Sequence, residues 1–146
     1  MAEPRITYDL AIREVERIAF RLAQEHLQFD EPIPDFSTRF PNILESCINM
    51  PFLKVYGKSL YPSLVSKAAI LFYLIIKNHP FVNGNKRIAV TTSMVFLMKN
   101  KKRLKAELHE LHDLTIWVAE SKPKEKNFIL MATEQFIRKN MENFGD

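Results

Sequence analysis

Hydrophobic residues recur at helical spacing along most of the chain, and this pattern predicts a mostly α-helical protein. Between Tyr8 and His26, charged residues separate four apolar positions: Ala11, Val15, Ile18 and Leu22. Such an amphipathic pattern predicts a helix with these four side chains on its core-facing side. The prolines of the next stretch, residues 28–41, disfavour a helix before Pro41. Pro41 itself is well placed to begin a short helix that ends near Met50.

Two segments in the middle of the chain, Leu64–Ile76 and Ile88–Met98, are apolar on almost every face. A helix without a polar face is expected to be surrounded by other helices, so both are predicted to be central core elements. We expect Pro62 to open the first of them. The preceding segment carries aromatic and β-branched residues on both sides of Gly57-Lys58, which indicates a hairpin or extended flap.

The last third of the chain predicts two more helices. The first is amphipathic and is marked by Leu108, Leu111, Leu114 and Val118. Pro123 can open the second, whose apolar residues are Phe128, Ile129, Ala132 and Phe136.

Length and composition favour one domain over residues 1–146. With 146 residues, 47% hydrophobic composition and three glycines, the chain fits one compact helical unit. Cys47 is the sole cysteine, so no internal disulfide can form and a reducing cytoplasmic setting is expected. The longest apolar run, Ala68–Ile76, is too short to span a bilayer, so we expect no membrane association.

The formal net charge of +4 and the basic run Lys99–Lys105 raise the question of an anionic partner. Aromatic residues do not interleave this run as they do in proteins that bind single-stranded nucleic acid. A solvated loop is therefore favoured over a nucleic-acid site.

The stretch KNHPFVNGNKR, Lys77–Arg87, places polar residues between the two central helices. The residue before a proline is pushed away from α geometry, so His79-Pro80 should stop the first helix. Gly84 permits unusual backbone conformations, and the first N–H groups of the following helix have no intrahelical partners, which makes a natural anion cradle. The helix dipole favours negative charge in the first turn, where Lys86 and Arg87 place two positive charges. A bound phosphate would offset this unfavourable arrangement.

Two further side chains of this stretch have candidate chemical roles. His79 can exchange a proton near neutral pH, which makes it the candidate general base. Asn83 could ligate a hydrated Mg²⁺ through its amide oxygen, although it supplies no negative charge and magnesium usually takes a carboxylate. Phe81 is interpreted as a core anchor.

The residues HPFVNGNKR resemble the core motif of the Fic/Doc family, HxFx(D/E)GN followed by GR or, in the Doc-like branch, KR. The similarity is closest to the death-on-curing toxins and extends over about residues 33–104. It implies a helical bundle with a short β-like flap, in which His79 takes a proton from a hydroxyl of a target protein. It also implies an anion-binding turn at Gly84 and Asn85, with Lys86 and Arg87 as phosphate contacts.

The resemblance further assigns a flap that docks the target chain by strand-like pairing, at Lys54, Val55, Tyr56, Gly57, Lys58, Ser59 and Leu60. Asn83 stands where the family has the acidic residue that holds Mg²⁺, so the resemblance implies Mg²⁺ as a cofactor at a site that lacks this acidic ligand. Lys86 and Val90 replace a glycine and an arginine of the AMP-transferring branch. Both replacements point to the Doc-like branch, which transfers the γ-phosphoryl group of ATP or another nucleoside triphosphate.

Three functions remain open at this point. The first is a Doc-like toxin that phosphorylates a Ser, Thr or Tyr hydroxyl of a target protein, and the second is an AMP transferase acting on such a hydroxyl. The third, favoured by Asn83, is a catalytically weak module that binds a nucleotide or a partner. The family's inhibitory pattern, Ser or Thr followed four residues later by Glu and then Gly or Asn, is absent, so a separate antitoxin is expected.

Overall fold

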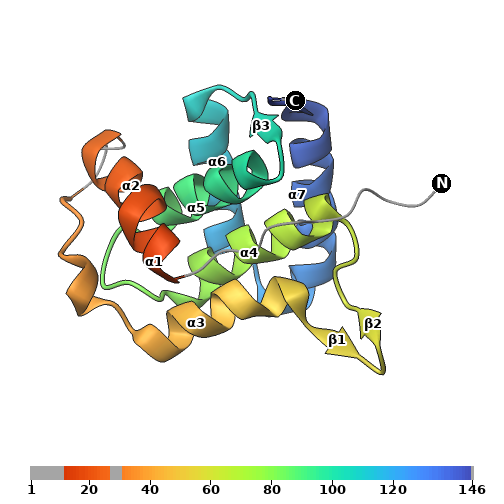
Figure 1. The fold of residues 1–146 in the computed structure, drawn as a ribbon, viewed down its shortest axis with the longest axis horizontal. Coiled ribbons are helices and arrows are strands. Elements are labelled where there is room, and N and C mark those ends of the chain that lie inside the picture. Colours follow the sequence, from red (N-terminus) through yellow and green to blue (C-terminus); the bar gives the residue numbers. More distant parts are fainter. Residues whose placement is uncertain (1–11, 27–30, 146) are drawn as a thin grey trace.

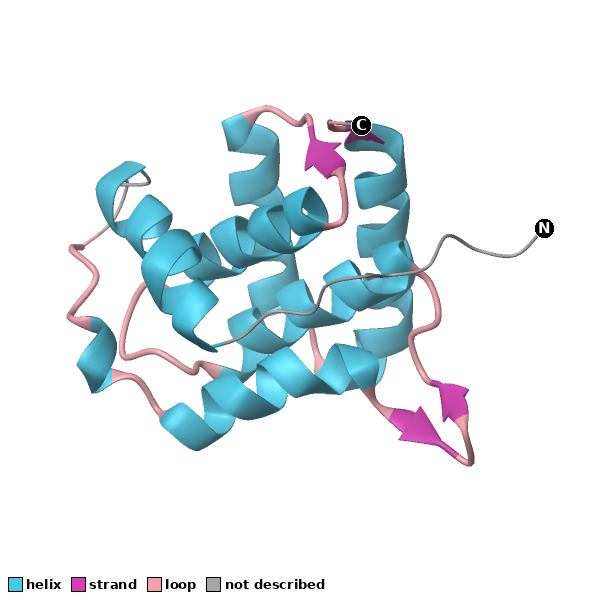
Figure 2. Ribbon diagram, in the orientation of Figure 1, coloured by secondary structure: helices cyan, strands magenta, loops and turns pink. Residues whose placement is uncertain are grey.

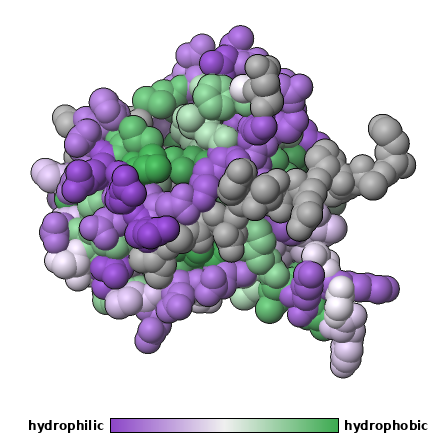
Figure 3. All heavy atoms as spheres, viewed as in Figure 1, coloured by the Kyte–Doolittle hydropathy of each residue, from purple (hydrophilic) through white to green (hydrophobic). Residues whose placement is uncertain are grey.

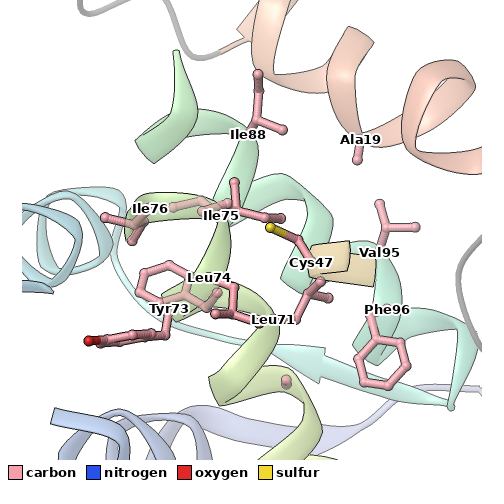
Figure 4. Close-up of a cluster of buried hydrophobic side chains, with 14 of the residues drawn as sticks. Ala19, Cys47, Leu71, Tyr73, Leu74, Ile75, Ile76, Ile88, Val95 and Phe96 are labelled. Atoms are coloured by element: carbon pink, nitrogen blue, oxygen red, sulfur yellow. The ribbon is translucent and has the colours of Figure 1, made fainter. Parts of the chain in front are cut away.

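Two long helices, α4 (Leu64–Asn78) and α5 (Asn85–Lys99), form the centre of the fold (Figure 1). The computed structural model describes residues 12–26 and 31–145. Both helices are buried along most of their length, as their apolar sequences predict. Figure 4 shows side chains of α4 and α5 in one buried cluster with Cys47 from α3 (Pro41–Asn49). Helices dominate the described chain (Figure 2), which confirms the mostly α prediction.

The first helix is continuous over residues 12–26 but contains a wide turn. It consists of α1 (Ile12–Glu14), a π-helical stretch (Val15–Phe20) and α2 (Arg21–His26). Its core side chains include Val15, Ala19 and Ala23, which are all fully buried.

The prediction of which residues of this helix face the core was partly wrong. Ile18 and Leu22 were expected to face the core, yet they are 43% and 39% exposed. A π turn bonds residue i to i+5 and holds more residues than an α turn, so it shifts the side of the helix that meets the core. The predicted start at Tyr8, and Ala11 with it, lie outside the described residues.

The predicted short helix at Pro41 is confirmed, and the flap that follows is a small hairpin. α3 continues into a 3-10 turn at Met50–Phe52, after which β1 (Lys54–Val55) pairs antiparallel with β2 (Lys58–Ser59). Tyr56 and Gly57 make the turn, with φ angles of 51° and 76°. Two successive residues with positive φ are typical of the tight hairpin turn whose twist suits two strands. The turn therefore lies one residue before the predicted Gly57-Lys58 centre.

Helix α4 begins with a serine cap rather than with Pro62. The Ser63 hydroxyl accepts a hydrogen bond from the Ser66 N–H, and the Ser66 hydroxyl accepts one from the Ser63 N–H, both at 3.0 Å. This reciprocal arrangement satisfies two N–H groups at the helix start. Pro62 precedes the capping residue and is not part of the helix.

Two helices and a second small sheet complete the fold. α6 (Leu108–Glu120) is followed by a 3-10 turn (Pro123–Glu125) and α7 (Lys126–Asn140), as predicted. Phe128 was expected among the packed residues of α7 but is 63% exposed. β3 (Lys102–Leu104) pairs antiparallel with β4 (Met141–Asn143), which the sequence pattern did not predict.

The basic run is therefore partly a strand, and carboxylates balance several of its charges. Lys99 pairs with Glu14 at 2.5 Å, and Arg103 and Lys105 both pair with Glu142. Because these carboxylates reduce the local positive potential, the run is a poor candidate for a nucleic-acid site.

Hydrophilic side chains cover much of the face seen in Figure 3, with hydrophobic patches between them. Within residues 12–26 and 31–145, every helix is too short or too polar to cross a bilayer.

Cys47 offers a direct test of this core. Burial raises the pKa of its thiol to about 11, and the side chain is fully buried. Because only the thiolate reacts with disulfide reagents, we expect the native thiol at pH 8 to react about 100-fold more slowly than the thiol of the urea-unfolded chain. Stopped-flow measurement with a chromogenic disulfide would show this difference, and equal rates in the two states would contradict the packing of α3 against α4.

Candidate functional site

The connection between α4 and α5 begins at a histidine with an unusual backbone. α4 ends at Asn78, as predicted, and His79 adopts a left-handed conformation with φ 52° and ψ 62°. That conformation costs a residue with a side chain about 1–2 kcal/mol, so neighbouring contacts must stabilise it. The sequence predicted the helix stop at His79-Pro80 but not this conformation.

The buried side chain of Asn85 holds the connection closed. Its Oδ1 accepts a hydrogen bond from the Phe81 N–H, and its Nδ2 donates to the Phe81 carbonyl, both at 2.9 Å. The Phe81 ring is buried against the rings of Phe20 and Phe36, with centroids 5.6 and 5.8 Å away. Phe81 is therefore the core anchor that the sequence predicted, and Asn85 ties the start of α5 to it.

The same amide faces the candidate base. Asn85 Nδ2 lies 3.4 Å from His79 Nδ1. Because Asn85 Oδ1 already accepts from Phe81, the group that faces the imidazole is an N–H donor. In a neutral imidazole, a donor facing Nδ1 is compatible with the tautomer that carries its proton on Nε2. At 3.4 Å the contact is longer than an ordinary N–H hydrogen bond, so the Nδ1 lone pair can still accept a proton.

Gly84 turns the chain into α5 at a place where only glycine fits. Its φ is +82°, and a Cβ atom there would lie 2.6 Å from Cγ1 of Ile33. The first intrahelical hydrogen bond of α5 runs from the Ile88 N–H to the Gly84 carbonyl. The N–H groups of residues 85–87 therefore have no intrahelical partners, and the positive end of the helix dipole lies beside them.

The two cations in the first turn of α5 have different surroundings. Lys86 is exposed and forms no ion pair with any residue in the described part of the chain. Arg87 is only 5% exposed, and its Nη2 donates to the Glu31 carbonyl at 2.7 Å. Lys86 is thus an exposed point charge, whereas Arg87 connects residues 31–40 to the motif through its hydrogen bond to Glu31.

That segment, residues 31–40, lies along the motif, and sequence reasoning missed it. Asn83 Nδ2 lies 3.4 Å from the Pro32 carbonyl, and the Phe40 N–H donates to the Pro80 carbonyl at 2.8 Å. These contacts use main-chain groups, which have no sequence signature. Pro32 and Pro34 identified the region as a loop but gave no sign of its neighbours.

The predicted docking flap lies away from these residues. The hairpin joins α4 at the amino end of the helix, whereas His79 follows its carboxyl end (Figure 1). A helix of 15 residues is about 22 Å long. A docking role for Lys54–Leu60 would therefore require a target large enough to span α4.

A cavity of about 170 Å³ brings the candidate residues together. It is lined by His79, Asn83, Gly84, Asn85, Lys86 and Arg87, and by the apolar residues Ile76, Val82 and Ala119. All six predicted motif residues thus share one cavity. Ala119 belongs to α6 and was not predicted, because no motif connects α6 with the connection between α4 and α5.

The cavity residues do not fit a magnesium ion held by the protein. Among residues 12–26 and 31–145, no carboxylate lines the cavity and no cluster of three or more potential metal ligands occurs. The Asn83 Oδ1 atom, the candidate ligand, accepts a hydrogen bond from the Gly84 N–H at 2.8 Å. Because Mg²⁺ usually takes at least one carboxylate from the protein, Asn83 alone makes a poor site.

Comparison with known proteins identifies the family of the chain. The sequence profile described as the Fic/DOC family matches residues 9–97, which is more than half of the chain. The protein therefore belongs to the Fic/Doc family. Among curated proteins, it is 36% identical over 73 residues to Toxin Doc of Mycolicibacterium smegmatis. That match covers 50% of this chain and 56% of the relative, so the chain spans little more than half of the relative's length. No solved structure matched the chain.

Asn83 gives a testable prediction about metal dependence. We expect calorimetry to show that EDTA changes the ATP affinity of the wild-type protein by less than about threefold. Asn83→Asp should make ATP binding about tenfold or more dependent on Mg²⁺, because a carboxylate repels the bare triphosphate and attracts the metal complex.

Asn49→Asp is a matched control, since it adds the same charge at an exposed position of α3 that does not line the cavity. A wild-type protein that binds ATP only with Mg²⁺ would contradict the assignment of Asn83.

Proposed function

We propose that this protein transfers the γ-phosphoryl group of ATP, or of another nucleoside triphosphate, to a Ser, Thr or Tyr hydroxyl of a target protein. One observation carries the proposal: a histidine and the amino end of a helix with an exposed lysine line the same cavity. A base beside a held phosphate is the arrangement that group transfer to a hydroxyl requires. Membership of the Fic/Doc family supports the same class of reaction.

In the proposed reaction, His79 accepts the proton of the target hydroxyl through the lone pair of an imidazole nitrogen. The hydroxyl oxygen forms a bond to the γ-phosphorus, the bond from that phosphorus to the β–γ bridging oxygen breaks, and a nucleoside diphosphate leaves. The N–H groups at the start of α5 and the Lys86 ammonium would stabilise the charge on the phosphate oxygens. In this proposal, the hydrogen bonds of Asn85 keep His79 beside the cradle.

Asn83 favours one alternative, a module that binds a nucleotide or a partner with little catalysis. Its side chain supplies no negative charge and already accepts the Gly84 N–H. Such a module would keep the cradle and lose the transfer step.

We further propose that the protein is the toxin of a toxin–antitoxin pair, with a separate antitoxin as partner. The similarity to a protein named Toxin Doc supports this role. The absence of the family's inhibitory pattern from the sequence supports a restraint that comes from another chain.

Transfer from two forms of labelled ATP tests the activity. We expect wild-type protein to transfer label from γ-labelled ATP to a protein of a bacterial lysate, and His79→Ala to reduce this by about 100-fold or more. His109→Ala is a matched control, because His109 is exposed on α6 and does not line the cavity. Transfer of α-label instead would indicate AMP transfer. If neither label transfers above the His79→Ala level, the enzymatic proposal is wrong.

A further inference from the structure

Lys77 connects α4 to the end of another helix beside the cavity. It lies in the last turn of α4, two residues before His79, and its side chain is partly buried. Its Nζ donates to the Ala119 carbonyl at 3.2 Å and to the Ser121 carbonyl at 2.6 Å. Ala119 lies in the last turn of α6 and Ser121 is the residue that caps this helix, so both carbonyls are far from Lys77 in sequence.

Lys77 places a cation at the carboxyl end of α6. The last carbonyls of a helix have no intrahelical partners and carry a partial negative charge, which basic residues in the last turn usually offset. The last turn of α6 contains no basic residue, and Glu120 adds a further negative charge there. Lys77 supplies, from α4, a positive charge that the last turn of α6 does not itself contain.

This helix end is also part of the cavity wall, since Ala119 lines the cavity together with His79 and Lys86. The positive amino end of α5 and the negative carboxyl end of α6 therefore border the same space. A polyphosphate held at α5 would be repelled by the α6 carbonyls if no cation covered them. The family profile matches residues 9–97, so the α6 wall lies beyond the matched region.

We propose that Lys77 is a positioning residue that holds the end of α6 as one wall of the nucleotide site and neutralises its negative end. This inference rests on the proposed function, because it assigns the anionic occupant of the same cavity. In this role Lys77 acts through the α6 carbonyls rather than by touching the nucleotide.

The test compares ATP, ADP and AMP binding to wild-type protein, Lys77→Met and Lys77→Arg by calorimetry. Methionine retains the length of the side chain but removes the charge, whereas arginine retains the charge. We expect Lys77→Met to weaken ATP binding about fivefold to thirtyfold and AMP binding less, because the repulsion grows with phosphate charge. Lys77→Arg should recover most of the loss, and Lys139→Met, at an exposed position of α7 away from the cavity, should match wild type.

Hydrogen exchange gives a second readout that needs no ligand. In Lys77→Met, the amides of residues 119–122 should exchange faster than in wild type. The inference is wrong, while the proposed function stands, if Lys77→Met binds all three nucleotides with the affinity of wild type. The same holds if its affinity falls by the same factor for all three. If the wild-type protein binds none of them, the proposed function fails, and the inference fails with it.

Discussion

The amide of Asn85 makes two hydrogen bonds with the backbone of Phe81, and these bonds close the connection between the two central helices. Phe81 is buried against two other aromatic rings, so the connection cannot shift without opening the core. His79, two residues before Phe81, and Gly84, between Phe81 and Asn85, are both left-handed. The site thus depends on one buried amide that keeps two unusual backbone conformations in place.

The surrounding structure is fastened to the central helices through main-chain carbonyls. Arg87 on α5 donates to Glu31, and Lys77 on α4 donates to the end of α6. A buried or partly buried cation is costly unless it is paired or hydrogen-bonded, so these contacts both satisfy the cations and fix the segments that they reach. As a result, parts of the chain distant in sequence border one cavity.

Much of the fold and the central motif could be predicted from the sequence. The all-apolar patterns of α4 and α5 identified the core, and HPFVNGNKR identified six residues that do line one cavity. The π-helical turn was not predictable, because it changes the phase of Val15, Ala19 and Ala23 without a local residue signal. The contacts of residues 31–40 and of α6 were missed for another reason: they run through backbone carbonyls, which every residue type offers. The flap was recognised as a hairpin, but sequence proximity to α4 could not show at which end of the helix it lies.

A crystal structure with a non-hydrolysable nucleoside triphosphate analogue tests most directly whether the amino end of α5 is the phosphate cradle. We expect phosphate oxygens about 3 Å from the N–H groups of residues 85–87, with the Lys86 ammonium beside them and His79 at the open side of the terminal phosphate. If the phosphates of the nucleotide lie elsewhere and only solvent contacts the first turn of α5, the connection between α4 and α5 is not the phosphate-binding site.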